Sequence, residues 1–267
     1  MELTLIHQII LGIIQGITEW IPISSSAMTS LVMANFFNIT DFSLLLQKSL
    51  FLHLGTFFAA LVYFRKDVTN LFVSLFNYKK SSTENKNILK FLIISTLITG
   101  VLGILIYSLL LDMDLEFTGQ IITLGIGGLL LITGGVQLIK KIPGIRKESD
   151  LKLSDSILLG TVQGISTLPG ISRSGITTST LLLKKFNDTS ALRLSFIMSL
   201  PVVLFANLLL NANELTTGLN LGSLLGLLAS FIFGLLTIHA LMNLSKKINF
   251  AWFVLIFAAL MILSVLI

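Results

Sequence analysis

Outside the segment Leu3–Thr40, five stretches of at least 20 residues carry no charged side chain, and they constrain the fold more than any other feature of the sequence. Each is long enough to cross a bilayer as a helix, which takes about 20 apolar residues. A sixth stretch is interrupted by Lys48 and His53 and ends at the basic pair Arg65-Lys66, so we count it as well. The six predicted spans are Phe42–Phe64, Phe91–Leu111, Phe117–Ile139, Leu194–Asn213, Leu215–Ser245 and Ile248–Ile267.

Polar residues are too few to cover a globule in water. Of the 267 residues, 54% are hydrophobic and 12% are charged, whereas soluble domains contain about 25% charged residues. This composition argues against a soluble enzyme, a disordered chain and a nucleic-acid-binding module. We expect an all-α, multi-pass protein of the cell membrane, surrounded by membrane lipids and without a nucleic-acid partner. The chain has no cysteine, and its three histidines (His7, His53 and His239) are too scattered to suggest a zinc site.

The connecting segments alternate in charge along the chain. Arg65–Lys90, Lys140–Lys152 and the pair Lys246-Lys247 are basic, while the connectors between them carry only acidic charges: Asp112, Asp114 and Glu116 in one and Glu214 in the other. Basic loops favour the cytoplasmic side of a membrane. We therefore predict that the three basic loops are cytoplasmic and that the acidic connectors lie outside.

Two further apolar segments are interrupted in the middle by polar residues. As one helix, Leu3–Thr40 would be about 57 Å long, nearly twice the thickness of the hydrocarbon core. Pro22 and three consecutive serines lie at its centre, so we predict two short helical arms joined at a polar break. Leu153–Leu183 has the same form, with its break at Pro169–Gly175.

The two breaks match at an offset of 148 residues. Gln15-Gly16-Ile17-Thr18 aligns with Gln163-Gly164-Ile165-Ser166, and the serines that follow align as well. Each half of the chain then holds one re-entrant helical hairpin and three transmembrane helices, and three crossings turn the second half over relative to the first. We predict an inverted-topology repeat within one membrane domain of residues 1–267, with repeats of about 1–148 and 149–267.

Polar and charged side chains gather at these breaks. An ionised side chain at membrane depth costs about 2.5–3.5 kcal/mol on insertion scales, so Glu19 and Arg173 call for a partner or a ligand. Arginine, hydroxyl groups and helix N-termini together form an anion site that suits phosphate, and a cleft facing lipid indicates an amphiphile with a phosphate head. The hydroxyls near the breaks are Ser24, Ser25, Ser26, Ser172, Ser174 and Thr177.

Plainer explanations exist for each of these features. Serine, threonine and glycine are frequent in membrane helices because they allow close packing. Glu19 and Arg173 could form an ion pair with a purely structural role. A histidine in an apolar span, such as His53, is more often a packing residue than a catalytic one.

The two break motifs resemble those of the bacitracin-resistance family of undecaprenyl-diphosphate phosphatases. The resemblance rests on Gln15–Ser26, on Leu168–Thr177 and on His53-Leu54-Gly55-Thr56 with Tyr63–Asp67, and it extends over essentially the whole chain. It implies inverted repeats with two re-entrant hairpins. It also implies removal of the terminal phosphate from undecaprenyl diphosphate, which regenerates a lipid carrier for cell-wall polymers and confers bacitracin resistance.

The resemblance also implies roles for individual residues. Glu19, Ser25 and Arg173 stand at positions that the family is held to need for activity, and Ser172, Ser174 and Thr177 stand at phosphate-binding positions. A divalent cation, usually magnesium, accompanies activity in the family. It would bridge the diphosphate to Glu19, with Ser25 as the nucleophile or as the residue that positions water.

One departure from the family pattern concerns proton transfer. The family continues after the serines with a glycine and a histidine, and this chain has Ala27 and Met28 there. Methionine can neither take nor give a proton, so we expect slower hydrolysis that Met28→His accelerates. His53 could substitute only if its helix packs against the first hairpin. A smaller departure is Gln15, where some members carry glutamate.

A competing hypothesis keeps the binding site but not the chemistry. Broken helices in inverted repeats are common in transporters, so the chain could be a polyprenyl-phosphate transporter or flippase with weak or no hydrolase activity. The missing histidine favours this alternative. The sequence also leaves open a homodimer.

Overall fold

The computed structural model describes residues 3–21, 23–111, 145–168, 171–212 and 219–244, together with isolated positions in 124–139 and 252–262. The described part of the chain is α-helical, and its single β-type contact is a bridge between Arg146 and Phe186. In chain order the elements are α1 (Leu5–Thr18), α2 (Ser25–Phe36), α3 (Phe42–Tyr63), α4 (Arg65–Phe76), η1 (Tyr78–Lys80), α5 (Thr83–Leu111), η2 (Glu148–Asp150), α7 (Leu153–Ile165), α8 (Arg173–Leu183), α9 (Asp188–Leu210) and α11 (Leu221–Leu244).

Four of these helices are long and apolar enough to cross a membrane: Ser43–Tyr63, Thr83–Leu109, Asp188–Leu210 and Leu221–Asn243. They confirm four of the six predicted spans and make the chain a multi-pass membrane protein. Most of the other two, at 117–139 and 248–267, lies outside the described residues. So do the predicted acidic connectors (Asp112, Asp114, Glu116 and Glu214) and the pair Lys246-Lys247.

The basic segment Arg65–Lys90, which we expected to be a loop, is largely helical. Only Phe64 separates α4 from α3, and α5 begins at Thr83, eight residues before the first predicted residue of that span. The prediction placed helix ends where charge begins. Charge marks where a helix leaves the hydrocarbon, but the helix itself can continue into a polar environment.

The two interrupted segments form pairs of short helices, as predicted. Serine side chains start the second helix of each pair: Ser24 Oγ accepts a hydrogen bond from the backbone of Ala27 at 3.3 Å, and Ser172 Oγ accepts one from Gly175 at 3.0 Å. A serine N-cap satisfies a backbone donor that the helix itself leaves without a partner. Pro22, Pro169 and Gly170 lie outside the described residues.

Small residues let the short helices approach the long ones. A Cβ on Gly12 of α1 would lie 2.0 Å from the carbonyl oxygen of Gly226 in α11, and a Cβ on Gly160 of α7 would lie 2.9 Å from the Cα of Ser95 in α5. Such contacts between glycines and other small residues are a common way to pack helices in membranes.

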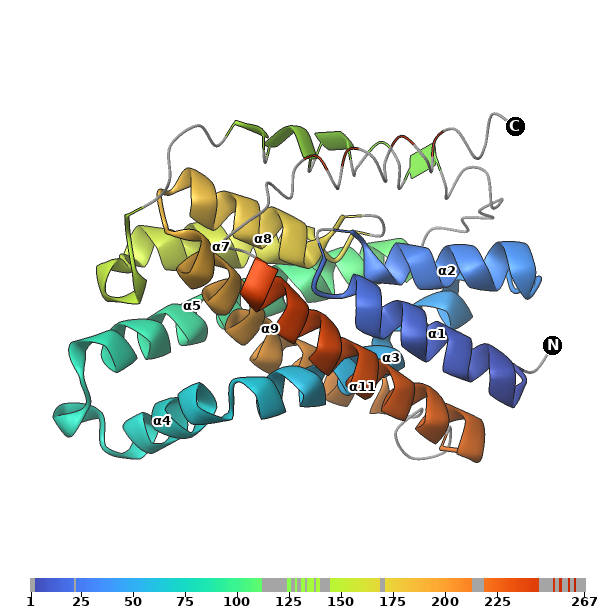
Figure 1. Ribbon diagram of the computed structural model, residues 1–267, viewed down its shortest axis with the longest axis horizontal. Helices are drawn as coiled ribbons and strands as arrows, with labels where there is room; N and C mark the ends of the chain where they lie inside the picture. The colour runs from blue at the N-terminus through green and yellow to red at the C-terminus, as the bar shows by residue number, and fades with distance from the viewer. Residues whose placement is uncertain are drawn as a thin grey trace.

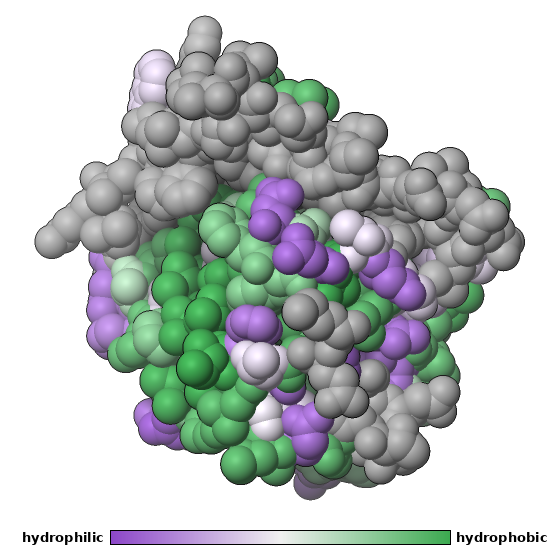
Figure 2. Space-filling view, turned by 90° about the vertical axis from the view of Figure 1, so that its right-hand side faces the viewer, coloured by the Kyte–Doolittle hydropathy of each residue, from purple (hydrophilic) through white to green (hydrophobic). Residues whose placement is uncertain are grey.

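The two short pairs lie on opposite sides of the molecule, and their broken ends face each other at its centre (Figure 1). Between them runs a core that includes Trp20, Phe64 and Phe196. The outward face of α5 is apolar instead of charged, with Leu97 66% and Val101 70% exposed, as expected for a surface in contact with lipid. Broad hydrophobic areas interrupted by polar patches also cover the end of the molecule seen in Figure 2.

A polar cluster joins several elements away from the broken ends. Arg193 of α9 donates to Glu148 Oε1 at 2.9 Å and to Asp67 Oδ1 at 2.7 Å. Nearby in the chain, Arg146 Nη2 lies 2.5 Å from Oδ2 of the fully buried Asp155. These pairs fix the starts of α4, α7 and α9 relative to one another.

Candidate active site at two helix breaks

The two breaks meet through side chains at the end of α1 and the start of α8. Arg173 Nη2 donates to Glu19 Oε1, and Ser174 Oγ donates to the backbone oxygen of Ile21 at 2.9 Å. The prediction that the breaks lie close together is therefore confirmed for the described residues. Residues from both halves of the chain contribute to one site.

Glu19 is the centre of this site. Only 5% of the residue is exposed, and its Oε2 accepts hydrogen bonds from Gln15 Nε2 at 2.8 Å and Ser25 Oγ at 2.6 Å. The same oxygen lies 3.0 Å from His53 Nε2. A buried carboxylate surrounded by donors and by an arginine is held as an anion in the folded protein.

Ser25 is the first residue of α2, and its hydroxyl is buried against the carboxylate of Glu19. The helix therefore holds this oxygen at its positive end, where negative charge is stabilised. His53 of α3 lies on the other side, with Nε2 3.5 Å from Ser25 Oγ. The condition that the sequence left open is met, because the helix of His53 packs against the first broken pair.

Arg173 is held on three sides. Its Nη2 binds Glu19, and its Nη1 donates to the backbone oxygen of Ser195 in α9 at 3.2 Å. The guanidinium also lies over the ring of Trp20, 5.5 Å from the centroid. These contacts orient the planar group so that its donors face the end of α1.

The predicted phosphate-binding hydroxyls lie at the starts of α2 and α8. Ser24 and Ser172 accept hydrogen bonds as the N-caps of these helices. Ser172 Oγ lies 3.3 Å from Ser174 Oγ, and Thr177 Oγ1 lies 2.6 Å from Ser195 Oγ. Ser26, the second residue of α2, is half-buried.

Three residues at the site were given no role by the sequence: Gln15, Trp20 and Ser195. Gln15 could have been found, because it precedes Glu19 by four positions, which places both on one face of α1. His53 was named from the sequence as a substitute for the missing histidine, on the condition that its helix packs against the first hairpin. Ser195 gives no local signal, since only the fold brings α9 to Arg173.

The donor set suits a magnesium ion that is shared with a substrate phosphate. Among the described residues, no group of three or more histidine, cysteine, aspartate or glutamate side chains is arranged so that it could hold a metal ion. Glu19 supplies one carboxylate, and the buried Oε1 of Gln15 beside it has no hydrogen-bond partner. Magnesium bound to phosphates usually takes only one or two carboxylates from the protein.

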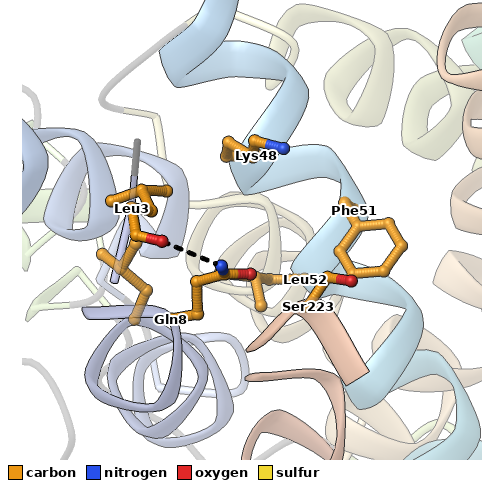
Figure 3. A pocket seen from close by; sticks show the side chains of 7 residues that line it. Leu3, Gln8, Lys48, Phe51, Leu52 and Ser223 are labelled. Atoms are coloured by element: carbon orange, nitrogen blue, oxygen red, sulfur yellow. Dashed lines mark hydrogen bonds between the residues drawn. The ribbon is translucent and has the colours of Figure 1, made fainter. Parts of the chain in front are cut away.

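A separate small pocket lies away from this site. It opens between the starts of α1 and α11 and the middle of α3 (Figure 3) and is lined by residues that include Gln8, Lys48 and Ser223. Gln8 Nε2 donates to the backbone oxygen of Leu3 across its edge at 3.2 Å. None of the predicted phosphate-site residues lines it.

The whole chain is similar to a known protein family. A family model described as bacitracin resistance protein BacA matches residues 8–263. The chain is 41% identical over 261 residues to a protein of Methanococcoides burtonii named undecaprenyl-diphosphatase, covering 94% of both chains. It is 34% identical over 264 residues to undecaprenyl-diphosphatase 2 of Halalkalibacterium halodurans, covering 94% of this chain and 91% of the relative. The chain therefore belongs to the bacitracin resistance protein BacA family.

Proposed function

We propose that this chain is an integral membrane phosphatase that hydrolyses undecaprenyl diphosphate to undecaprenyl monophosphate and phosphate. The family and the names of the relatives support this function. The observation that carries it is the contact of a buried hydroxyl, a carboxylate and an arginine, Ser25, Glu19 and Arg173, at the meeting point of two broken helix pairs. The product is a lipid carrier for cell-wall polymers such as peptidoglycan, and its recycling confers bacitracin resistance.

Arg173 is the proposed clamp for the diphosphate. Its guanidinium is paired with Glu19, so a phosphate bound to Arg173 would lie beside this carboxylate. A guanidinium binds phosphate through two parallel hydrogen bonds. The proposed phosphate-binding hydroxyls, Ser24, Ser26, Ser172, Ser174 and Thr177, lie at two helix N-termini, which also favour an anion.

Ser25 is the proposed nucleophile, or the residue that positions the attacking water. As nucleophile, its Oγ forms a bond to the terminal phosphorus while the bond from that phosphorus to the bridging oxygen breaks and the monophosphate leaves. Glu19 accepts the proton of Ser25, whose Oγ already donates to it at 2.6 Å. Water then releases phosphate from the serine. Arg173 stabilises the charge that develops on the phosphoryl oxygens.

A divalent cation, with Mg²⁺ as the expected ion, stays part of the proposal. Glu19 and Gln15 Oε1 would hold it together with the substrate. When bound, it neutralises charge on the diphosphate.

The finer architecture is also a proposal: one domain of two inverted repeats, each with a re-entrant hairpin. Two pairs of residues at the offset of 148 have equivalent places in the structure. Gly12 and Gly160 both lie at tight helix contacts, and Ser24 and Ser172 are both N-caps. Moreover, α1 of the first half packs on α11 of the second half, and α7 of the second half packs on α5 of the first. The first short helix of each half therefore packs on a long helix of the other half. A homodimer stays a prediction, and the proposed site is built from one chain.

Phosphate release by the purified, detergent-solubilised protein tests the proposed function. With magnesium and undecaprenyl diphosphate we expect continuous release by the wild type and a loss of about 10²-fold or more for Ser25→Ala, since this substitution removes the nucleophile. A wild type that binds the lipid but releases no phosphate would contradict the proposal. The comparisons do not support the flippase alternative, and that result would revive it.

A further inference from the structure

We propose that His53 is a further catalytic residue of this site and supplies the proton transfer that Met28 cannot supply. The inference rests on the proposed phosphatase function. The motif after Ser25 has Met28 where the resembled family has a histidine, yet an imidazole from α3 reaches the same hydroxyl in the folded chain.

The orientation of the imidazole follows from its hydrogen bonds. Nδ1 lies 2.7 Å from the backbone oxygen of Ser49. Because a carbonyl oxygen only accepts, Nδ1 carries a hydrogen. The other nitrogen, Nε2, therefore faces the site, 3.0 Å from Glu19 Oε2 and 3.5 Å from Ser25 Oγ. A catalytic imidazole is commonly oriented in this way by a bond at its second nitrogen.

The positions of His53 and Glu19 connect two proton carriers to the nucleophile. Nε2 lies 3.0 Å from Glu19 Oε2 and 3.5 Å from Ser25 Oγ, and Oε2 accepts the hydrogen bond of Ser25. The pair can relay a proton while the Oγ–phosphorus bond forms and the bridging P–O bond breaks. The proton of Ser25 goes to Glu19, passes from Glu19 to Nε2, and is delivered from Nε2 to the oxygen of the departing monophosphate.

The backbone around His53 is fixed from both sides, as a catalytic position requires. Asn207 of α9 donates to the backbone oxygen of Leu50 at 3.0 Å, and Ser230 of α11 donates to that of Leu52 at 2.9 Å. A Cβ on Gly55 would lie 2.6 Å from the backbone oxygen of Leu227. The imidazole is thus presented by a helix that two neighbours hold in register.

The position of Met28 shows that an imidazole can approach Ser25 either from α2 or from α3. It lies one turn after Ser25 in α2 and is half-buried, so it lies on nearly the same helix face as the hydroxyl. Because His53 already contacts Ser25, we now expect Met28→His to accelerate hydrolysis chiefly when His53 is absent. This revises the expectation drawn from the sequence.

The test compares His53→Gln with wild type in phosphate release from undecaprenyl diphosphate. Glutamine keeps a donor toward Glu19 but cannot relay a proton, so kcat should fall by about 10²–10⁴-fold, with KM nearly unchanged. His239→Gln is the matched control. It removes an imidazole from α11 that bonds Asn243 at 3.0 Å on the exposed surface, and it should keep the wild-type rate.

Adding Met28→His to His53→Gln separates a catalytic from a structural role. We expect the double variant to regain at least tenfold in kcat, because a second imidazole returns to the site, while its melting temperature stays near that of His53→Gln. The role of His53 would be overturned if His53→Gln kept the wild-type kcat, or if its kcat fell and Met28→His failed to raise it. Either result would leave the proposed phosphatase function standing. A wild type that releases no phosphate would overturn the proposed function together with the role of His53.

Discussion

Arg173 donates a hydrogen bond to Glu19 although 154 positions separate the two residues. One ends the first helix of the first broken pair and the other begins the second helix of the second pair. The contact therefore depends on both halves of the chain, and removal of either residue leaves the other with a charge that has lost an oppositely charged partner. Such a charge is costly unless a ligand replaces the missing partner.

Arg173→Lys keeps the charge but not the planar fork. Lysine cannot bind the phosphate through two parallel bonds, and it loses the bond that Nη1 makes to the backbone of Ser195. We expect kcat/KM for phosphate release to fall by about 10²-fold, the typical cost of one donor to transition-state charge. Arg65→Lys, at an exposed position, serves as the control and should change little. A lysine variant as active as wild type would rule out the clamp.

Gly12→Ala should destabilise the protein, because its Cβ would lie 2.0 Å from the backbone of Gly226. Overpacking of this kind costs about 1–3 kcal/mol. Gly100→Ala in α5 is the matched control, since a Cβ there meets nothing within 4 Å. Thermal unfolding in detergent should show a lower melting temperature for the first variant and an equal or higher one for the second. Equal melting temperatures for Gly12→Ala and wild type would show that α1 and α11 are not so closely packed.

Asp155 links stability to pH. Burial alone would raise the pKa of Asp155, but hydrogen bonds from Arg146 and the Lys152 backbone, with the charge of Lys184, hold it below the ordinary value of 3.8. Because the folded-state pKa is lowered, the stabilisation is present above about pH 4 and is lost as the pH falls through the folded-state pKa. Asp155→Asn should therefore lower the melting temperature at pH 7 and make less difference as the pH falls below 4.

Asp41→Asn is the control for that series. Asp41 is the N-cap of α3, and asparagine caps a helix about as well as aspartate, so its melting temperature should follow the wild type. A difference between Asp155→Asn and wild type that stays constant from pH 7 to pH 3 would contradict the role of the carboxylate charge.

Much of the fold could be predicted because the membrane restricts the choices. Uncharged stretches located α5, α9 and α11, and an apolar stretch that ends at Arg65-Lys66 located α3. The serines at the breaks marked the starts of α2 and α8. The charge pattern failed at Arg65–Lys90, because it reports the edge of the hydrocarbon and not the end of a helix.

Only some residues of the site could be predicted from the sequence. Glu19, Ser25 and Arg173 lie in motifs that repeat, so their proximity could be inferred. His53 and Ser195 come from long helices whose rotation and crossing are set by tertiary packing, such as the close contact of Gly55 with α11. No local pattern encodes that packing, so the sequence could name His53 only as a conditional substitute, and its contact with Ser25 emerged only from the structure.

A double-mutant cycle on phosphate release from undecaprenyl diphosphate tests most directly whether the two halves form one active site. It compares wild type, Glu19→Gln, Arg173→Gln and the double variant under the same magnesium concentration. We predict that each single substitution lowers the rate by about 10²-fold or more and that the double variant is no slower than the worse single variant, since residues that act as one unit are strongly non-additive. Single variants with wild-type rates, or a double variant whose loss equals the product of the two single losses, would contradict a shared site.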